Sequence, residues 1–344
     1  MKYNPTTLDI VLDDKCNLTC KGCIKQSFKN GTAVIDYDTF VDTIENFSDK
    51  AISNVHFTGG EPFLKFERIK EIVKQNRLTT SSSITEFSIY SNLTRLTDEI
   101  IFFLKSNKIT IHTSIDGFEA ENDLIRGCGS WRDIVYNITR LKNNNVYLQS
   151  ITTTLKNENF HAIDDDFLSF ICDINVPVWR LNINYLGLDF DPEEVIEKVY
   201  GLYQFANIRN IKVEGTWLYP FNNMLSNNKE GFCPALKGDI MALLPNGSIS
   251  LCPYSKTIIG SFKDNLEVLS QKYEEIKIKH SKSNIGGCNE CFINEYCQNH
   301  CMVTTESGSK QLNDWFCKIY RNLTYMLLQN HINQNKLNNN FENN

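Results

Sequence analysis

The chain lacks both a long hydrophobic run and a marked excess of charge of either sign. No segment approaches the roughly 20 apolar residues of a membrane-spanning helix, and the first five residues contain no apolar signal core. The 35 Lys and Arg residues against 41 Asp and Glu residues give a net charge of −6, too weak to draw the chain to nucleic acid or an anionic membrane. These absences predict a cytoplasmic protein with neither nucleic-acid nor membrane partners.

Internal repeats are absent as well, whereas cysteine is abundant, with 12 residues among 344. In a reducing cytosol these thiols are better interpreted as metal ligands than as disulfides. The length of the chain and its 41% hydrophobic content are sufficient for two cores. The composition therefore favours a metal-binding enzyme of more than one domain.

Strand-like and helix-like segments alternate over about the first 200 residues. The expected strands are residues 7–13, 52–58, 84–91, 109–116, 146–154 and 178–185. The expected helices are residues 38–47, 66–75, 97–106, 131–143, 165–172 and 192–206. Six β/α units in succession predict an α/β fold whose parallel sheet, closed or curved, forms a partial (β/α)6 TIM-like barrel.

Four polar motifs follow expected strands, where parallel sheets collect their chemistry. The first is a C-x3-C-x2-C motif formed by Cys16, Cys20 and Cys23. The others are Gly59-Gly60-Glu61-Pro62, Ser91-Asn92 and Ser114-Ile115-Asp116-Gly117. We expect all four to meet on one rim of the barrel.

Three thiolates are one short of a closed tetrahedral metal site or a fully capped 4Fe-4S cluster. A 4Fe-4S cluster held by Cys16, Cys20 and Cys23 would keep one iron open to a bidentate small molecule. The motif therefore indicates a reaction centre rather than a structural metal site.

The alternating pattern stops after about residue 210. Residues 233–317 are rich in cysteine and glycine, which indicates a small domain organised by metal. We expect a barrel at residues 1–208, a bridging segment at 209–232, a cysteine-rich domain at 233–320, and a C-terminal helix with a disordered tail at 321–344. The last helix should cover residues 314–334, and the asparagine-rich segment after it should fray.

The cysteine-rich region contains a second, more specific motif. Its spacing is C-x13-G-x4-C, a gap, C-x2-C-x5-C-x3-C, a gap and a last cysteine. The positions are Cys233, Gly247, Cys252, Cys288, Cys291, Cys297, Cys301 and Cys317. Zinc ribbons and knuckles also use C-x2-C pairs, so the spacing alone leaves a zinc module open.

Together these motifs resemble radical S-adenosylmethionine (SAM) enzymes with a SPASM auxiliary-cluster domain, over nearly the whole chain. The resemblance implies a SAM-binding 4Fe-4S cluster on the first three cysteines, SAM itself and two auxiliary Fe-S clusters. It implies SAM contacts from Gly59, Gly60, Glu61, Pro62, Ser91, Asn92 and Ser114, with Arg126 on the SAM carboxylate. Gly22 departs from the family pattern, since an aromatic residue that packs by the adenine usually precedes the third cysteine. For Asn92 and Asp116, caps of the following turns remain an alternative.

The same resemblance implies ligand sets for the two auxiliary clusters. Cys288, Cys291, Cys297 and Cys317 would hold the outer cluster, and Cys233, Cys252 and Cys301 the inner one. The inner set lacks a fourth cysteine. A substrate thiol, water or a side chain such as Asp239 could complete it, or the cluster could be of another type.

The function that the resemblance implies is reductive cleavage of SAM to a 5'-deoxyadenosyl radical, which takes hydrogen from carbon. We expect the substrate to be a peptide that is oxidised or crosslinked through a thioether or C-C bond. A dehydrogenase or epimerase of an amino-sugar or cyclitol is the alternative, and a zinc scaffold the third. Pro253 stands where sulfatase-maturating relatives have an aspartate base, which disfavours formylglycine formation.

Partners follow from the same resemblance. We expect an electron donor such as flavodoxin or ferredoxin. Because the chain begins almost at the first expected strand, no fused leader-binding domain is expected. Any leader peptide would then need a separate recognition protein or direct binding to the barrel face.

Two cysteines and three histidines receive no role. Cys172 is expected to be an ordinary buried thiol, and Cys128 is left unassigned. His56, His112 and His300 are each interpreted as satisfied core or surface residues rather than ligands.

Overall fold

The computed structural model describes residues 3–27, 37–45, 52–78, 84–282 and 288–342. The strands are β1 Thr7–Val11, β2 Asn54–Thr58, β3 Glu86–Tyr90, β4 Thr110–Ser114, β5 Leu148–Leu155, β6 Val178–Ile183, β7 Lys212–Glu214, β8 Ile240–Leu243, β9 Ser248–Ser250 and β10 Ile258–Ser261. The α-helices are α1 Tyr37–Glu45, α2 Phe66–Leu78, α3 Asp98–Asn107, α4 Glu119–Arg126, α5 Ser130–Asn143, α6 Asp165–Ile174, α7 Pro192–Ile208, α8 Tyr219–Leu225, α9 Pro234–Lys237, α10 Leu266–Lys282, α11 Asn294–Cys297, α12 Met302–Ser307 and α13 Lys310–Glu342. Short 3-10 helices cover Ile24–Ser27, Pro62–Lys65, Thr216–Leu218 and Cys288–Glu290.

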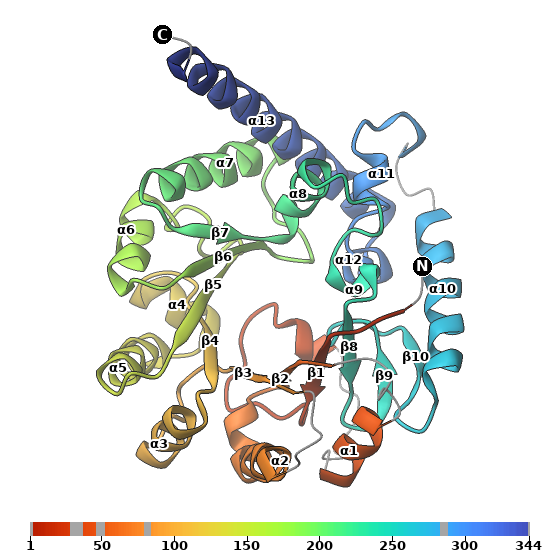
Figure 1. Ribbon diagram of the computed structural model, residues 1–344. Coiled ribbons are helices and arrows are strands. Elements are labelled where there is room, and N and C mark those ends of the chain that lie inside the picture. Colours follow the sequence, from red (N-terminus) through yellow and green to blue (C-terminus); the bar gives the residue numbers. More distant parts are fainter. Residues whose placement is uncertain (1–2, 28–36, 46–51, 79–83, 283–287, 343–344) are drawn as a thin grey trace.

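One ten-stranded sheet organises the molecule, in the order β10-β9-β8-β1-β2-β3-β4-β5-β6-β7. Strands β1 to β7 are parallel neighbours, with helices outside the curved sheet (Figure 1). All six expected strands are present, so the α/β fold with a partial barrel is confirmed. The last two residues of the expected first helix, 46 and 47, lie outside the described residues.

The cysteine-rich region also contributes strands to this sheet. Strand β8 pairs in parallel with β1, with Leu243 opposite Ile10, and β9 and β10 continue antiparallel beyond it. The sheet therefore joins the cysteine-rich segment directly to the first barrel strand. This pairing brings residues more than 200 positions apart into one layer.

Local sequence explains why the helices of the barrel begin where they do. The Thr97 side chain accepts a hydrogen bond from the backbone of Ile100 at the start of α3, and Asp164 caps α6 in the same way. Helix α7 begins with Pro192, whose missing N–H is no loss at that position. These caps place each helix directly after the loop that follows a strand end.

Two elements differ from the expected pattern. Helix α4 was not expected, because its eight residues are too short for a clear helical period. Helix α13 begins at Lys310 and ends at Glu342, and it projects from the body of the molecule (Figure 1). Among the described residues, no helix combines the length and apolarity needed to cross a bilayer.

Candidate functional site

The loop after β2 approaches the loop after β1 at backbone distance. A Cβ on Gly60 would lie 2.1 Å from the Lys15 carbonyl oxygen, and one on Gly59 would lie 2.5 Å from the Asp13 oxygen. The backbone N–H groups of Gly60 and Glu61 donate to those same two carbonyls. Gly59 also has φ +150°, which glycine adopts without strain. The two glycines therefore hold this loop against the segment that carries Cys16.

Glu61 is almost fully buried, and its carboxylate has three donors. Oε1 accepts from the Phe63 N–H at 3.0 Å and the Ser91 hydroxyl at 2.8 Å, and Oε2 accepts from the Asn92 N–H at 2.8 Å. Burial raises the pKa of Glu61 to about 7, although these three hydrogen bonds act in the opposite direction. The structure thus joins two of the motifs expected to share the rim, residues 59–62 and residues 91–92.

Asn92 both caps its own turn and reaches the first cysteine. Its Oδ1 accepts from the Thr94 N–H at 2.9 Å, which is the turn-capping role. Its Nδ2 donates to Cys16 Sγ at 3.7 Å and to Asn17 Oδ1 at 3.1 Å. The two interpretations of Asn92 are therefore compatible, because each uses a different atom of the amide.

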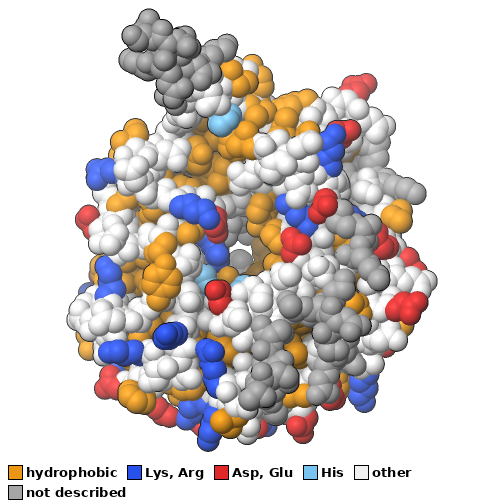
Figure 2. Space-filling view, viewed as in Figure 1, with side chains coloured by type: hydrophobic (Ala, Val, Ile, Leu, Met, Phe, Trp, Pro, Cys, Tyr) orange, Lys and Arg blue, Asp and Glu red, His pale blue; other side chains and the backbone are white. Residues whose placement is uncertain are grey.

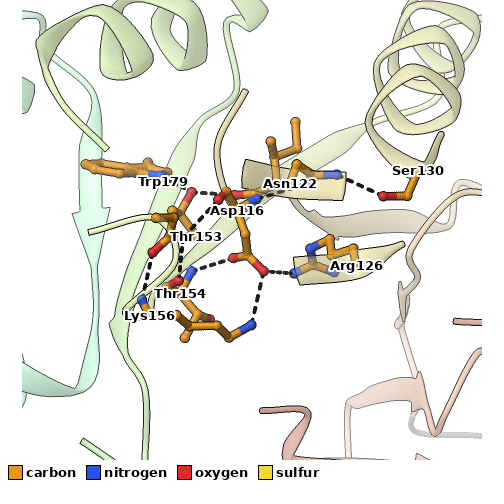
Figure 3. A network of polar contacts seen from close by, with 10 residues as sticks. Asp116, Asn122, Arg126, Ser130, Thr153, Thr154, Lys156 and Trp179 are labelled. Carbon is orange, nitrogen blue, oxygen red and sulfur yellow. Dashed lines mark hydrogen bonds and ion pairs between the residues drawn. The ribbon is translucent and has the colours of Figure 1, made fainter. Parts of the chain in front are cut away.

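Asp116 lies at the centre of a buried ionic network (Figure 3). Its Oδ2 lies 2.8 Å from Arg126 Nη2 and 3.4 Å from Lys156 Nζ, and its Oδ1 accepts from the Thr154 N–H at 2.8 Å. The carboxylate is completely buried, and the two cations hold the pKa of Asp116 below its usual value in spite of that burial. Asp116 is thus an internal counter-ion rather than a simple turn cap.

Arg126 has one paired and one unpaired side. Nη2 contacts Asp116, whereas Nε is buried and has no hydrogen-bond partner among the described residues. The guanidinium charge also interacts with the thiols of Cys20 and Cys23. Arg126 therefore lies beside the cysteine motif with a donor still available.

The three N-terminal cysteines gather on this rim. The thiol of Cys16 interacts electrostatically with those of Cys20 and Cys23, and Cys20 also interacts with Arg126 and Lys156. Ser114 ends β4 two residues before Asp116, and its side chain makes no hydrogen bond with the described residues. Pro62 opens the 3-10 helix after the glycine loop.

The seven C-terminal cysteines form two groups, defined by which other cysteines each thiol interacts with electrostatically. Cys297 interacts with Cys288, Cys291 and Cys317, and Cys317 interacts with Cys288 and Cys291. Cys252 interacts with Cys301 and Cys233. Burial raises the pKa of each of Cys233, Cys252, Cys297, Cys301 and Cys317, so thiolate forms there need a compensating cation.

Neither group is built for a single ion. Among the described residues, no three His, Cys, Asp or Glu side chains converge closely enough to hold one metal ion. Zinc would require its ligands about 2.3 Å from one centre, whereas an iron-sulfur cluster spreads its thiolates around a larger core.

Lys25 and Tyr254 lie between the first cysteine motif and the inner group. The Lys25 ammonium donates to the Pro253 carbonyl at 2.5 Å and lies 5.2 Å from the centre of the Tyr254 ring. Its charge interacts with Cys252 and Cys23. Sequence reasoning missed both residues, because nothing local shows that residues 25 and 254 meet.

Polar side chains occupy positions on the strands that would face a barrel interior. Asp9 on β1 bonds His56 on β2 at 2.9 Å, and His112 on β4 bonds Ser150 on β5 at 2.7 Å. His112 stacks on Tyr90, with 4.3 Å between ring centres. His56 and His112 are therefore satisfied by partners, in agreement with their expected roles.

This band of polar side chains inside the barrel continues onto strands β6 and β7. Arg180 on β6 donates to the Tyr90 hydroxyl at 3.0 Å and to Glu214 on β7 at 3.0 Å. A barrel packed only for stability fills its interior with branched apolar side chains. Figure 2 shows instead a hollow at the centre of this face, with histidine, basic and acidic side chains around it. The interior is therefore suited to a polar ligand.

Replacing Gly60 tests the close approach of the two loops. In Gly60→Ala, the new Cβ would overlap the Lys15 carbonyl, so the loop must shift, and we expect a loss of about 1–3 kcal/mol of stability with weakened SAM binding. Gly201→Ala on α7 is the control, because its Cβ would meet nothing within 4 Å; it should gain about 0.4–1 kcal/mol. Chemical unfolding and SAM titration measure both. Equal changes in stability and SAM affinity for the two variants would contradict the predicted overlap with the Lys15 carbonyl.

Comparisons with known proteins agree with this architecture. Residues 10–169 match the model of the radical SAM superfamily. The radical SAM cyclopropyl synthase TigE of Paramaledivibacter caminithermalis is 23% identical over 345 residues, covering 93% of this chain and 70% of TigE.

Two solved structures share the fold. The enzyme anSMEcpe, solved with AdoMet and the Cp18Cys peptide, has a TM-score of 0.75 at 17% identity, covering 95% of this chain and 99% of that one. Streptococcus suis SuiB bound to its precursor peptide SuiA has a TM-score of 0.68 at 17% identity, covering 90% and 74%. Residues 10–169 are a radical SAM domain, as the motifs around Cys16 and Gly60 predict.

Proposed function

We propose that the protein is a peptide-modifying radical SAM enzyme with two auxiliary Fe-S clusters. The radical SAM domain implies a 4Fe-4S cluster and SAM. In this proposal Cys16, Cys20 and Cys23 hold that cluster. The outer auxiliary cluster is held by Cys288, Cys291, Cys297 and Cys317, and the inner one by Cys233, Cys252 and Cys301. The observation that carries the proposal is the meeting of the three-cysteine motif, the glycine loop and the Asp116 network on one rim.

The described residues fit the cluster and SAM. Three thiols lie together, and Asn92 donates a hydrogen bond to one of them. The loop of Gly59 and Gly60 has no side chain that would keep a ligand away from its backbone. The unpaired Nε of Arg126 is a buried donor, which a ligand carboxylate would satisfy. When bound, the cluster and SAM supply a 5'-deoxyadenosyl radical that takes hydrogen from carbon.

The protein's own residues would fix SAM at both ends of its amino-acid portion. Glu61 is held by three donors, so its carboxylate is oriented before any ligand arrives. Its carboxylate therefore gives this loop a fixed anionic group for the ligand ammonium. Asp116 holds the guanidinium of Arg126 in place for the ligand carboxylate. Both contacts are preorganised by buried hydrogen bonds, which reduces the entropy lost on binding.

The polar barrel interior would receive the substrate. A peptide carries a backbone donor and acceptor on nearly every residue, and the band from Asp9 to Glu214 offers groups of both kinds. The fold relatives anSMEcpe and SuiB have each been solved with a peptide. We propose the same substrate class here, with an electron donor such as flavodoxin or ferredoxin and a separate leader-recognition protein.

Mass spectrometry tests the substrate class. The anaerobically reconstituted protein would be incubated with SAM, a reductant and candidate precursor peptides. A loss of two hydrogens would indicate crosslinking or dehydrogenation, and deuterium uptake without another mass change would indicate epimerisation. If SAM is cleaved while every peptide stays unchanged and an amino-sugar or cyclitol is oxidised, the small-molecule alternative holds instead.

The pKa of Glu61 predicts how SAM binding depends on pH. With a pKa of about 7, Glu61 is largely protonated below pH 7, and a bound ammonium favours its carboxylate form. Binding should therefore release a proton, so affinity should rise with pH between about 5.5 and 7, by up to about tenfold per unit. Glu61→Gln should bind more weakly without this slope. Glu99→Gln, on the exposed surface of α3, should keep it. Calorimetry in several buffers measures the proton release, and a flat profile in the unmodified protein would refute the assignment.

A further inference from the structure

His300 is a completely buried histidine whose ring nitrogens have no partner. Its exposed fraction is 0%, and both Nδ1 and Nε2 make no hydrogen bond with any described residue. The ring approaches the backbone of Cys301, but with a geometry outside that of a normal hydrogen bond. Each buried polar group without a partner costs about 1–3 kcal/mol. An imidazole in this position therefore requires a partner that the polypeptide does not supply.

The backbone around His300 is held in an uncommon conformation. Gln298, Asn299 and His300 all have positive φ, at 47°, 67° and 50°, and none of them is glycine. Each such residue is disfavoured relative to the right-handed region, so three in succession store strain. The strain is confined to the three positions between Cys297 and Cys301. The segment is thus bent specifically where two cysteines of different groups come together.

Two aromatic rings of α13 lie next to the imidazole, and one of them, Tyr320, interacts with cysteines of both groups. The His300 ring centre lies 5.7 Å from that of Tyr320 and 6.2 Å from that of Phe316, both on α13. The Tyr320 hydroxyl group interacts electrostatically with Cys301, and more weakly with Cys297 and Cys317. His300 also directly precedes Cys301 in the chain. Because the ring is completely buried, bulk solvent does not contact its nitrogens.

The inner cysteine group is one ligand short of a closed cluster. Cys233, Cys252 and Cys301 interact with one another, and no other cysteine joins them in the described residues. Imidazole is a known iron ligand and replaces thiolate in some Fe-S clusters. We infer that a ring nitrogen of His300 is the fourth protein ligand of the inner auxiliary cluster. This inference rests on the proposed function, since it requires that the cluster be present.

The second ring nitrogen has a natural partner in this arrangement. A coordinating histidine usually donates its other N–H to a carboxylate or a backbone carbonyl. The Cys301 backbone already lies beside the ring, so a small rotation would complete that hydrogen bond. Asp239 is the other side chain considered as a fourth ligand, but it is half-exposed near Lys237 and Lys277 and has no comparable need of a partner.

Histidine labelling tests the inference directly. The full chain would carry Cys16→Ala, Cys20→Ala and Cys23→Ala, so that only the auxiliary clusters contribute signals, and would be reconstituted anaerobically with iron and sulfide. In the reduced protein, pulsed EPR should show the nitrogen coupling of a directly bonded imidazole. Growth with ¹⁵N-histidine should convert that coupling to its ¹⁵N form.

Two variants assign the coupling to one residue. His300→Cys should keep the iron and sulfide content, because a thiolate replaces the imidazole, but should lose the nitrogen coupling entirely. His280→Gln is the matched control, since His280 is a nearby, partly buried histidine whose Nε2 bonds the His300 carbonyl; it should keep the coupling.

The outcomes separate this inference from the proposed function. Iron and sulfide present without a histidine coupling in the labelled protein, or a coupling that survives in His300→Cys, would overturn the inference and leave the clusters in place. Zinc without labile sulfide would overturn the proposed function itself. The ¹⁵N-histidine experiment leaves position 300 unchanged, so it still gives a result if a substitution there prevents folding.

Discussion

Cys20→Ala should abolish SAM cleavage. Cys20 is the middle cysteine of the first motif, and its thiol interacts with Cys23 and with the cations Arg126 and Lys156. Two remaining thiolates would leave the cluster short of a ligand, so we expect about four fewer iron atoms per chain and no 5'-deoxyadenosine above background. Iron analysis and chromatography of the anaerobically reconstituted protein measure the two quantities.

The control for this experiment is another cysteine in the same barrel. Cys172 is partly buried on α6 and belongs to neither the rim nor the C-terminal groups. Cys172→Ala should retain the iron content and the SAM cleavage of the unaltered chain. Full 5'-deoxyadenosine production by Cys20→Ala would contradict the assignment of the first motif.

Asp116→Ala should be among the most destabilising single substitutions on the rim. The change removes the only carboxylate near Arg126 and Lys156 in the described network, and it leaves both cations buried without a counter-ion. The buried Thr154 N–H loses its acceptor at the same time. Removing one partner from a buried ion pair typically lowers the free energy of unfolding by about 3–5 kcal/mol, and we expect a loss in that range.

An exposed ion pair provides the comparison. Asp98 pairs with Arg140 at the start of α3, but the Asp98 side chain is 98% exposed. Asp98→Ala should therefore lower the free energy of unfolding by no more than about 1 kcal/mol. Urea unfolding of both variants under anaerobic conditions measures the difference. Similar losses for the two would show that the Asp116 network contributes little to stability.

The N-terminal half of the site could be predicted from sequence because its residues lie in short segments of the chain. Cys16, Cys20 and Cys23 lie within one loop, and each remaining motif follows an apolar strand-like run. Parallel strands bring their carboxyl ends to one edge, so the motifs had to meet once the β/α rhythm was recognised. The resemblance to radical SAM enzymes rests on these motifs, whereas the pairing of Arg126 with Asp116 required the contact itself.

Other features depend on distances along the chain that no local pattern encodes. Lys25 meets Pro253 across 228 positions, and β8 joins β1 across more than 200. The polar barrel interior is a similar case, because Asp9, His112 and Arg180 each look like single polar residues within apolar strands. Only the register of the strands aligns them into one band.

His300 shows most clearly where sequence and structure differ. From its sequence context it resembled an ordinary core histidine, because such residues normally find a hydrogen-bond partner. In the tertiary structure His300 has no such partner among the described residues, and aromatic rings of α13 pack next to its ring. The sequence by itself determined the barrel, the cysteine spacing and the radical SAM motifs, since these depend on short-range periodicity and motif. Only the folded chain decided which charges are paired, what lines the interior and which buried nitrogen lacks a partner, because burial and pairing arise from contacts between distant segments.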